Sequence, residues 1–156
     1  MVRNHFTATG IVFNGNNDIL MINHSKLNAW LPPGGHINDN ELPCAAVLRE
    51  IYEETGVRAR VLPNTRGLGL PDMELDLPFT IILEDIEGDG THNHIDMIYL
   101  CRAETSDILT QTSEVRGAGW FTHEQVKRLK TFDNVLKTIE RAVEYIETRT
   151  DNDDGL

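Results

Sequence analysis

Three glutamates lie close together on one helix that the sequence predicts between Pro43 and Thr55. They are Glu50, Glu53 and Glu54. Because successive residues of an α-helix are rotated by about 100°, the three carboxylates share one narrow face of that helix. Like charges at this spacing destabilise a helix by roughly 0.2–0.5 kcal/mol per pair. Since Mg²⁺ and Mn²⁺ are hard cations that prefer oxygen ligands, the face predicts a divalent-metal site.

An acidic triplet on a solvated helix face is common, so the spacing around this one matters more than the triplet itself. The segment reads glycine, five residues, glutamate, seven residues, Arg-Glu, an aliphatic residue, one residue, Glu-Glu, one residue, glycine and a second aliphatic residue. These positions are occupied by Gly35, Glu41, Arg49, Glu50, Ile51, Glu53, Glu54, Gly56 and Val57. The segment resembles the Nudix box at every fixed position, in a predicted loop–helix–loop.

Two further segments resemble the Nudix family more loosely. Residues 30–35, Trp-Leu-Pro-Pro-Gly-Gly, look like the family's approach to the box, and residues 117–121, Gly-Ala-Gly-Trp-Phe, look like its late strand. The resemblance covers roughly residues 5–149. It implies an α/β fold, a Nudix-type α/β/α sandwich around a mixed β-sheet, as a single domain over residues 1–149.

The resemblance also implies an activity. It points to a divalent-metal-dependent pyrophosphohydrolase that cleaves a phosphoanhydride bond by attack of water at phosphorus. The substrate would be a nucleoside diphosphate linked to another moiety, as in a nucleoside triphosphate or a nucleotide sugar. Glu50, Glu53 and Glu54 are then the ligands of Mg²⁺ or Mn²⁺, and the Gly34 carbonyl is an additional ligand. Glu50 is the first candidate to orient or deprotonate the attacking water.

Arg49 is expected to organise the catalytic carboxylates and not to clamp phosphate. As the helical neighbour of Glu50 it diverges from the face of that residue, yet its guanidinium fork can pair with Glu53. Glu41 precedes the helix. It either ties the loop to the helix through hydrogen bonds or is an ordinary acidic residue at a helix start.

Several polar residues outside the box are candidates for substrate contact or for an additional acid: His36, Glu87, Asp89, Asp96 and Glu114. His92, His94 and Asp96 alternate, so in a strand they share one face. Two histidines and a carboxylate can bind a metal. A polar face at a junction between loop and strand is the interpretation that we favour for this set.

Aromatic and thiol side chains are predicted to be structural. Trp30, Tyr99 and Trp120 could stack on a base, but a place in the core is favoured for each. Cys44 has no neighbouring base to activate its thiol. We therefore expect Cys44 to be a small buried or half-buried residue of the helix and not a nucleophile.

The remaining pattern predicts strands with helices between and after them. Residues 7–13 and 19–23 flank a hairpin-like Asn-Gly-Asn-Asn turn, and Gly56 ends the helix that begins at Pro43. Ala45, Leu48 and Tyr52 are expected to be the buried stripe of that helix. Further strands are predicted at 57–62, 79–83, 95–101 and 118–121, with a long loop at 63–78. A helical stripe follows at Phe132, Val135, Leu136, Ile139, Val143 and Ile146, and residues 150–156 are predicted to be an acidic, disordered tail.

Composition narrows the class of ligand. The chain has 156 residues, which suits one domain, and a formal net charge of −11. Without a cluster of Lys and Arg it is not expected to bind a long nucleic acid, and no apolar run is long enough to span a membrane. A small nucleotide-like diphosphate carried by a divalent cation suits an acidic site. The opening residues lack the apolar segment of a secretory signal, and Cys44 and Cys101 form no disulfide framework, so we expect a cytoplasmic monomer or homodimer.

Two other functions fit the same fold. A non-catalytic Nudix domain could bind a nucleotide-like ligand as a sensor, although such domains usually lack some of the box carboxylates that this chain retains. Isomerase chemistry on an isoprenoid diphosphate would need a reactive cysteine in the site. Neither Cys44 nor Cys101 is well placed for that role.

Overall fold

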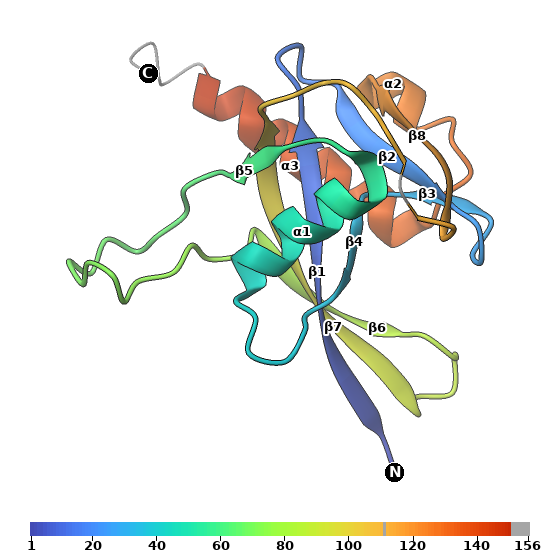
Figure 1. Cartoon of the computed structure of the whole chain (residues 1–156), viewed down its shortest axis with the longest axis horizontal. Coiled ribbons are helices and arrows are strands. Elements are labelled where there is room, and N and C mark those ends of the chain that lie inside the picture. Colours follow the sequence, from blue (N-terminus) through green and yellow to red (C-terminus); the bar gives the residue numbers. More distant parts are fainter. Residues whose placement is uncertain (111, 151–156) are drawn as a thin grey trace.

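The protein, described here as a computed structural model over residues 1–110 and 112–150, is built around one mixed β-sheet (Figure 1). The strands are β1 (Arg3–Phe13), β2 (Ile19–His24), β3 (Ala29–Leu31), β4 (Gly34–His36), β5 (Ala59–Val61), β6 (Thr80–Asp85), β7 (His92–Ala103) and β8 (Val115–Phe121). The helices are α1 (Pro43–Thr55), α2 (His123–Val126) and α3 (Asp133–Thr150).

Strand β1 organises the sheet because it pairs with three other strands. The order of the main path is β3-β2-β1-β7-β5, with β4 on β1, β6 on β7 and β8 on β2. β7 runs parallel to β1 along its whole length, from Arg3 opposite His92 to Phe13 opposite Arg102. β4 is antiparallel to the middle of β1 and places Gly34 opposite Thr9. The first part of the box therefore lies directly beside the central strand.

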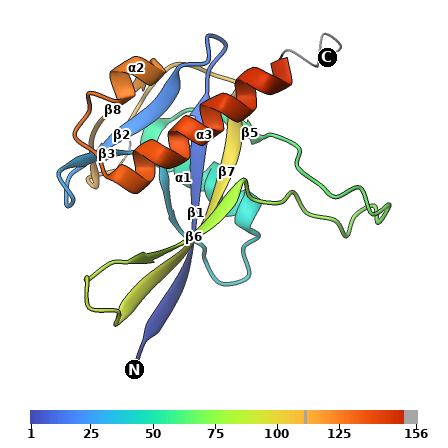
Figure 2. The same ribbon diagram turned by 180° about the vertical axis from the view of Figure 1, so that it is seen from behind.

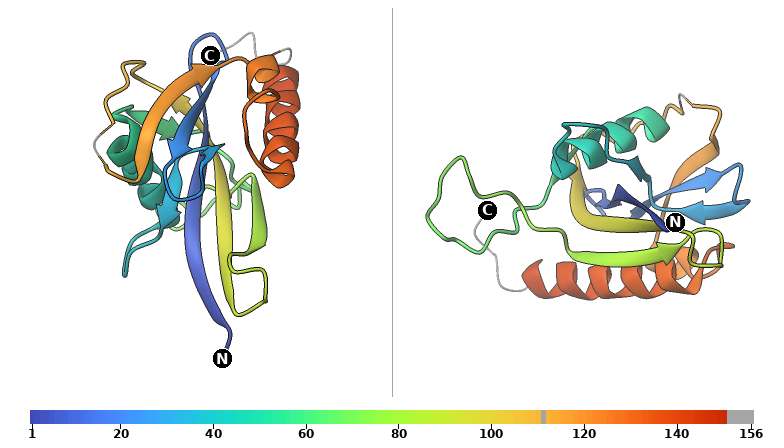
Figure 3. Two further views of the ribbon diagram at one scale, coloured as in Figure 1. Left: turned by 90° about the vertical axis from the view of Figure 1, so that its right-hand side faces the viewer. Right: turned by 90° about the horizontal axis from the view of Figure 1, so that it is seen from below.

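The helices cover opposite faces of the sheet, α1 on one and α3 on the other (Figures 2 and 3). Two groups of buried side chains fill the spaces between these layers. The group under α1 contains Ala8, Val12, Leu20, Ala46, Val47, Ile51, Val57, Tyr99 and Cys101. The group under α3 contains Ile11, Phe13, Ile19, Met21, Ile98, Leu100, Val126, Ile139, Ala142 and Ile146. The arrangement confirms the predicted α/β/α sandwich.

Helix α1 begins and ends where the sequence predicts. Pro43 occupies its first turn, where a missing N–H costs nothing. Gly56 ends it with a left-handed φ of 72°, and its N–H donates to the carbonyl of Tyr52. A glycine is favoured there because other residues adopt this conformation at a cost.

The buried face of α1 differs from the prediction. Ala45 and Tyr52 are exposed and Leu48 is only half-buried, whereas Val47 and Ile51 are fully buried. The reason lies across the interface, in β1. A Cβ on Gly10 would stand 2.8 Å from Cδ1 of Ile51 and 3.1 Å from Cγ2 of Val47. The bare backbone of that glycine therefore admits this pair of side chains and fixes the rotation of the helix.

Strand boundaries were predicted less well than strand existence. β1, β7 and β8 each begin three or more residues earlier than predicted, while β5 is shorter. The first residues of β1 and β7 are mostly polar, so apolar alternation does not predict a strand there. They are strands because the two segments pair with each other from Arg3 opposite His92 onward. The non-helical segment 30–35 contains parts of β3 and β4. The short helix α2 follows the segment 117–121, and Thr122 and Gln125 form a reciprocal capping box at its start.

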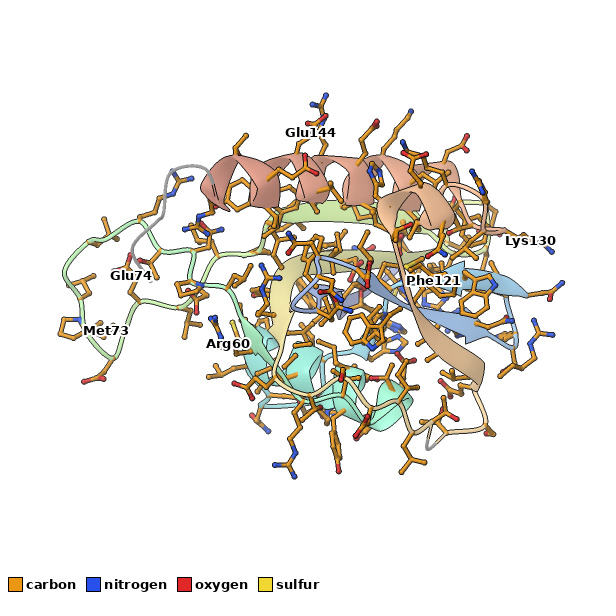
Figure 4. All side chains as sticks on the ribbon, turned by 90° about the horizontal axis from the view of Figure 1, so that it is seen from above. Arg60, Met73, Glu74, Phe121, Lys130 and Glu144 are labelled. Atoms are coloured by element: carbon orange, nitrogen blue, oxygen red, sulfur yellow. The ribbon has the colours of Figure 1, made fainter. Side chains whose placement is uncertain are left out.

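The loop between β5 and β6 extends away from the body of the protein, with Met73 and Glu74 far from the sheet (Figure 4). The tail predicted from Thr150 onward lies, from residue 151, outside the described residues. Within 1–110 and 112–150, no helix has the length and apolarity that a membrane span requires.

Candidate active site

Glu54 is the buried member of the glutamate triplet. Its exposed fraction is 4%. Oε2 of its carboxylate accepts a hydrogen bond from the backbone N–H of Gly34, at 3.0 Å. This bond joins the last turn of α1 to the start of β4, so helix and sheet position the carboxylate together. Burial raises the pKa of Glu54 to about 8. The hydrogen bond from the Gly34 N–H lowers this pKa, and the negative charges of the neighbouring glutamates raise it further.

Glu50 lies against the backbone of Gly35. A Cβ on that glycine would stand 2.6 Å from both Cδ and Oε1 of Glu50, so a larger residue would displace the carboxylate. Burial raises the pKa of Glu50, and the negative charges of Glu53 and Glu114 raise it further. The hydrogen bond and the positive charge of Arg49 lower it. Two of the three glutamates thus carry desolvated carboxyl groups that favour a neutralising partner.

Arg49 connects the glutamates with one another. Its Nη1 donates to Oε1 of Glu50 at 2.7 Å and to Oε2 of Glu53 at 3.1 Å. The predicted contact with Glu53 is therefore present. The expectation that Arg49 diverges from Glu50 is wrong, because its long side chain folds back across the helix to reach that neighbour. Nη2 also donates to the carbonyl of His36 at 2.9 Å, which ties the helix to β4.

Glu41 holds the other side of the Arg49 guanidinium. Nε and Nη2 of Arg49 donate to the two carboxylate oxygens at 2.7 and 2.9 Å, a bidentate pair. The hydrogen bond from Arg49 holds the pKa of Glu41 below its ordinary value. The N–H of Asn38 donates to Oε2 of Glu41 at 3.0 Å. Of the two predicted roles, the structure supports a tie between the loop and the helix.

Glu114, which lies about 60 residues after the triplet in the sequence, acts on it through its charge. It is exposed and lies immediately before β8, where its backbone carbonyl accepts the N–H of Ser25 at 2.8 Å. Its negative charge raises the pKa values of both Glu50 and Glu54. Of the acidic residues considered from outside the box, Glu114 is therefore one whose charge acts on the box carboxylates.

The other acidic candidates lie elsewhere. Asp96 is buried on β7, and its Oδ1 accepts the hydroxyls of Thr7 at 2.8 Å and Thr9 at 3.0 Å. Burial raises its pKa. Glu87 and Asp89 belong to the β6–β7 turn, at the end of the hairpin away from α1 (Figure 1). The structure does not bring these two to the box glutamates.

A group of histidines, not predicted as a set, gathers where β1, β4 and β7 meet. His5 faces His94 across the parallel strands, and His36 lies on the adjacent β4. The ring of His36 is 5.3 Å from that of His5 and 4.9 Å from that of His94, between centroids. The alternation of His92, His94 and Asp96 predicts one shared face, and the register of β7 with β1 confirms it. His94 lies opposite His5, and Asp96 lies opposite Thr7, two positions further along the same face. His5 was missed because only the long-range pairing of β1 with β7 places it there.

The aromatic candidates are structural, as predicted. Tyr99 is buried in the core under α1. Trp30 packs edge-on against Phe121 at 5.1 Å, beside the core under α3 (Figure 4 labels Phe121). Nε1 of Trp120 donates to the carbonyl of Ser106 at 2.9 Å.

Neither cysteine is activated. Burial raises the pKa of the Cys44 thiol, which lies beside the backbone carbonyl of Asp76 at 3.9 Å. Cys101 is completely buried, and its pKa is raised further. A thiol that stays protonated is a poor nucleophile and acid, which disfavours the isomerase alternative.

The donor set of the candidate site fits a hard divalent cation. Glu50, Glu53 and Glu54 offer carboxylate oxygens, the ligands that Mg²⁺ and Mn²⁺ prefer. Gly34 and Gly35 have no side chains, so their backbone can lie close to the glutamates. A Cβ on Gly34 would stand 2.6 Å from Oγ1 of Thr9, which leaves no room for a larger residue there. Raised carboxyl pKa values mean that a cation would relieve an existing electrostatic cost.

Comparisons with known proteins agree with this geometry. A probable DHNTP pyrophosphohydrolase of Lactococcus lactis subsp. cremoris is 29% identical over 101 residues, which is 65% of this chain and 55% of that protein. An 8-oxo-dGTP diphosphatase of Proteus vulgaris is 31% identical over 49% of this chain and 74% of that protein. The match thus spans little more than half of the Lactococcus protein.

A solved structure matches the fold over nearly the whole chain. It is a hydrolase of the NUDIX family from Clostridium perfringens, with a TM-score of 0.78 and 26% sequence identity. The alignment covers 93% of this chain and 99% of that one. The family model described as the NUDIX domain matches residues 3–142. The box geometry, the fold and this match agree, and the chain belongs to the Nudix family.

Proposed function

We propose that the protein is a divalent-metal-dependent pyrophosphohydrolase acting on a small nucleotide-like diphosphate. One observation carries the proposal: Glu54 is buried beside Glu50 and Glu53, with its pKa raised to about 8. A purely structural helix face would keep its acidic residues in solvent, where they cost little. Burying one among like charges is destabilising unless a proton or a cation neutralises it, and a cation can replace the proton.

Each residue of the site has a distinct part. Glu50, Glu53 and Glu54 hold Mg²⁺ or Mn²⁺, with the Gly34 carbonyl as an additional ligand. Arg49 fixes the orientation of Glu50 and Glu53, and Glu41 fixes Arg49. When bound, the cation neutralises the diphosphate and makes water more acidic. The protein thereby supplies positioning and charge, the two requirements of phosphoryl transfer.

Proton removal from water is assigned to Glu50. Its carboxylate is pressed against Gly35 and hydrogen-bonded to Arg49, so its position is fixed, and its raised pKa makes it a stronger base than an exposed glutamate. Glu114 is a second candidate, because its charge acts on the same carboxylates. Attack of the water at phosphorus breaks the phosphoanhydride bond and releases two phosphate-terminated products.

The substrate class follows from the relatives and from charge. One curated relative is named as a DHNTP pyrophosphohydrolase and another as an 8-oxo-dGTP diphosphatase. Substrate contact is proposed for His36, whereas Asp96 is buried against Thr7 and Thr9 and Glu87 lies in the β6–β7 turn away from α1. The loop at 63–78, which carries Arg66, is proposed to select among diphosphates. The net charge of −11 suits a substrate that arrives with its own divalent cation.

A panel of nucleoside triphosphates and nucleotide sugars, incubated with Mg²⁺ or Mn²⁺ in ¹⁸O-labelled water, tests the proposal. Mass spectrometry of the products identifies both the substrate and the phosphorus attacked. Metal-dependent cleavage that is lost in Glu53→Gln supports it. Tight binding of a nucleotide with no cleavage of any compound would instead favour the sensor alternative.

A further inference from the structure

Four of the six histidines of the chain lie around one point of the sheet. His5 comes from β1, His36 from β4, and His92 and His94 from β7. The ring centroids of His92 and His94 are 5.2 Å apart, and those of His5 and His92 are 4.8 Å apart. This histidine cluster contains none of the box glutamates.

Three of these histidines have the arrangement of metal ligands. One ring nitrogen from each of His5, His36 and His94 lies within 4.8 Å of the other two. In a tetrahedral zinc site with Zn–N distances of about 2.0–2.1 Å, ligand nitrogens are about 3.3 Å apart. Rotation of the exposed His36 ring and small shifts of the other two would close the remaining difference.

His94 presents a nitrogen that the protein itself does not use. Among the described residues, Nε2 of His94 is buried and has no hydrogen-bond partner. Leaving such a buried group unsatisfied destabilises the folded protein. Burial, followed by the neighbouring histidines, lowers the pKa of His94 to about 4, so the ring is neutral and offers a lone pair. A cation, unlike an anion, would satisfy that lone pair.

A second layer of contacts orients His5. Nε2 of His92 lies 3.2 Å from Nδ1 of His5, and Nδ1 of His92 lies 3.4 Å from a carboxylate oxygen of Glu87. Chains of this kind, from carboxylate to imidazole, commonly hold histidine ligands at metal centres. They give Glu87 and His92 a role that does not require contact with substrate.

The cluster is accessible from solvent. A surface pocket of about 640 Å³ is lined by His5 and His36 together with residues of β1 and of the loop before α1. An ion can therefore reach the rings of His5 and His36 from this pocket. A tetrahedral ion held by three histidines would keep one position open toward the pocket. The backbone carbonyl of His36 accepts a hydrogen bond from Arg49, whereas its ring belongs to the histidine cluster. The glutamate site and the histidine cluster therefore both involve β4 but have no proposed ligand in common.

We propose that His5, His36 and His94 form a second metal site, selective for a borderline transition-metal ion, with Zn²⁺ as the best fit. Imidazole nitrogens suit Zn²⁺, whereas Mg²⁺ and Mn²⁺ prefer the oxygens of the glutamates. The chain thus separates two classes of cation by ligand chemistry. The inference stands on the geometry of the histidines and does not depend on the proposed hydrolysis.

Calorimetric titration of the purified full chain with Zn²⁺, in the presence of saturating Mg²⁺, tests the proposal. Mg²⁺ occupies the glutamates, so the remaining Zn²⁺ binding reports on the histidine cluster. One Zn²⁺ per chain is expected, with shifts in the imidazole C–H resonances of His5, His36 and His94 in NMR spectra. His36→Ala, at an exposed position, and His5→Ala should each weaken binding at least about tenfold.

Two matched variants keep the result interpretable. His123→Ala removes a histidine outside the cluster and should bind Zn²⁺ as the wild type does. Glu53→Gln should lose the Mg²⁺ response and keep the Zn²⁺ site. Circular dichroism establishes that each variant is folded. The proposal is overturned if Zn²⁺ fails to bind beside Mg²⁺, or if binding is insensitive to His36→Ala and His5→Ala.

Discussion

The carboxylate of Glu54 and the backbone N–H of Gly34 are joined by a hydrogen bond of 3.0 Å that connects the box helix to the box strand. The bond spans 20 residues of sequence and keeps a buried carboxyl group beside two other glutamates. It also explains why the box includes a turn and a helix together. The helix supplies the carboxylates, and the glycine-rich strand supplies the backbone against which they are placed.

The stability of the metal-free protein should decrease as the pH rises through neutrality. The pKa of Glu54 is raised from 4.5 to about 8 on folding. Between these values the folded state holds a proton that the unfolded state has released, so its stabilising effect is complete below about pH 4.5 and is lost as the pH approaches 8. The free energy of unfolding should fall on the order of 2 kcal/mol between pH 6 and pH 8.

Urea unfolding in the presence of a chelator measures this slope. Glu54→Gln should flatten it, and saturating Mg²⁺ should remove it in the wild type, because the cation replaces the proton. A metal-free protein whose stability is constant or increases over this range would contradict the assignment. The same substitution should abolish turnover without unfolding the chain.

Arg49→Lys should reduce both Mg²⁺ affinity and kcat/KM by about 10- to 100-fold, the usual effect of losing a partner that orients metal ligands. A lysine ammonium cannot reproduce the forked contacts to Glu41, Glu50 and Glu53. Calorimetry with Mg²⁺ and steady-state kinetics provide the measurements.

The matched control for Arg49 is Arg141→Lys. Arg141 pairs with Glu144 on the exposed surface of α3, where Figure 4 shows Glu144 directed away from the sheet. This change should leave Mg²⁺ affinity unaltered, since exposed pairs contribute little. Equal effects of the two substitutions would remove the special role of Arg49.

Gly35→Ala should impair turnover far more than stability. Its Cβ would stand 2.6 Å from the carboxylate of Glu50 and displace it, and a displacement of about 1 Å in a catalytic group costs about 100-fold in rate. Gly15→Ala is the control, because a Cβ there has no atom within 4 Å. Kinetic assays and thermal unfolding of both variants compare the effects. Full activity in Gly35→Ala would show that Glu50 need not occupy its present position.

Two substitutions on α1 test the face that the structure buries. Ile51→Ala should destabilise the protein by about 2–5 kcal/mol, because it leaves a cavity against Gly10. Tyr52→Ala should cost about 1 kcal/mol or less, since Tyr52 is 42% exposed. Urea unfolding distinguishes them. The reverse order would favour the buried stripe that the sequence pattern predicts.

How much the sequence predicts depends on how local the signal is. Proline at the start and glycine at the end predict α1 to the residue, and helical periodicity predicts that Glu50, Glu53 and Glu54 converge. The predicted buried face of α1 is wrong because the face that packs on the sheet depends on Gly10, which lies 41 positions before Ile51 in the sequence. Apolar periodicity alone does not indicate which stripe meets a glycine in another strand.

The histidine cluster and the position of Glu114 were beyond local patterns. His5 and His94 meet only because β1 and β7 pair in parallel across 89 residues of sequence, with a register that no short motif encodes. Glu114 was one of several acidic residues outside the box, and only the fold distinguishes it from Glu87 and Asp89. Sequence patterns therefore predicted the chemistry of the helix, while tertiary pairing determines what surrounds it.

Diffraction from a crystal soaked in Mn²⁺, recorded where manganese scatters anomalously, tests the central claim most directly. An anomalous peak is expected within about 2.5 Å of carboxylate oxygens from Glu50, Glu53 and Glu54. Loss of that peak in Glu53→Gln would strengthen the assignment. Well-ordered glutamates with no manganese between them, at a concentration that supports turnover, would contradict it.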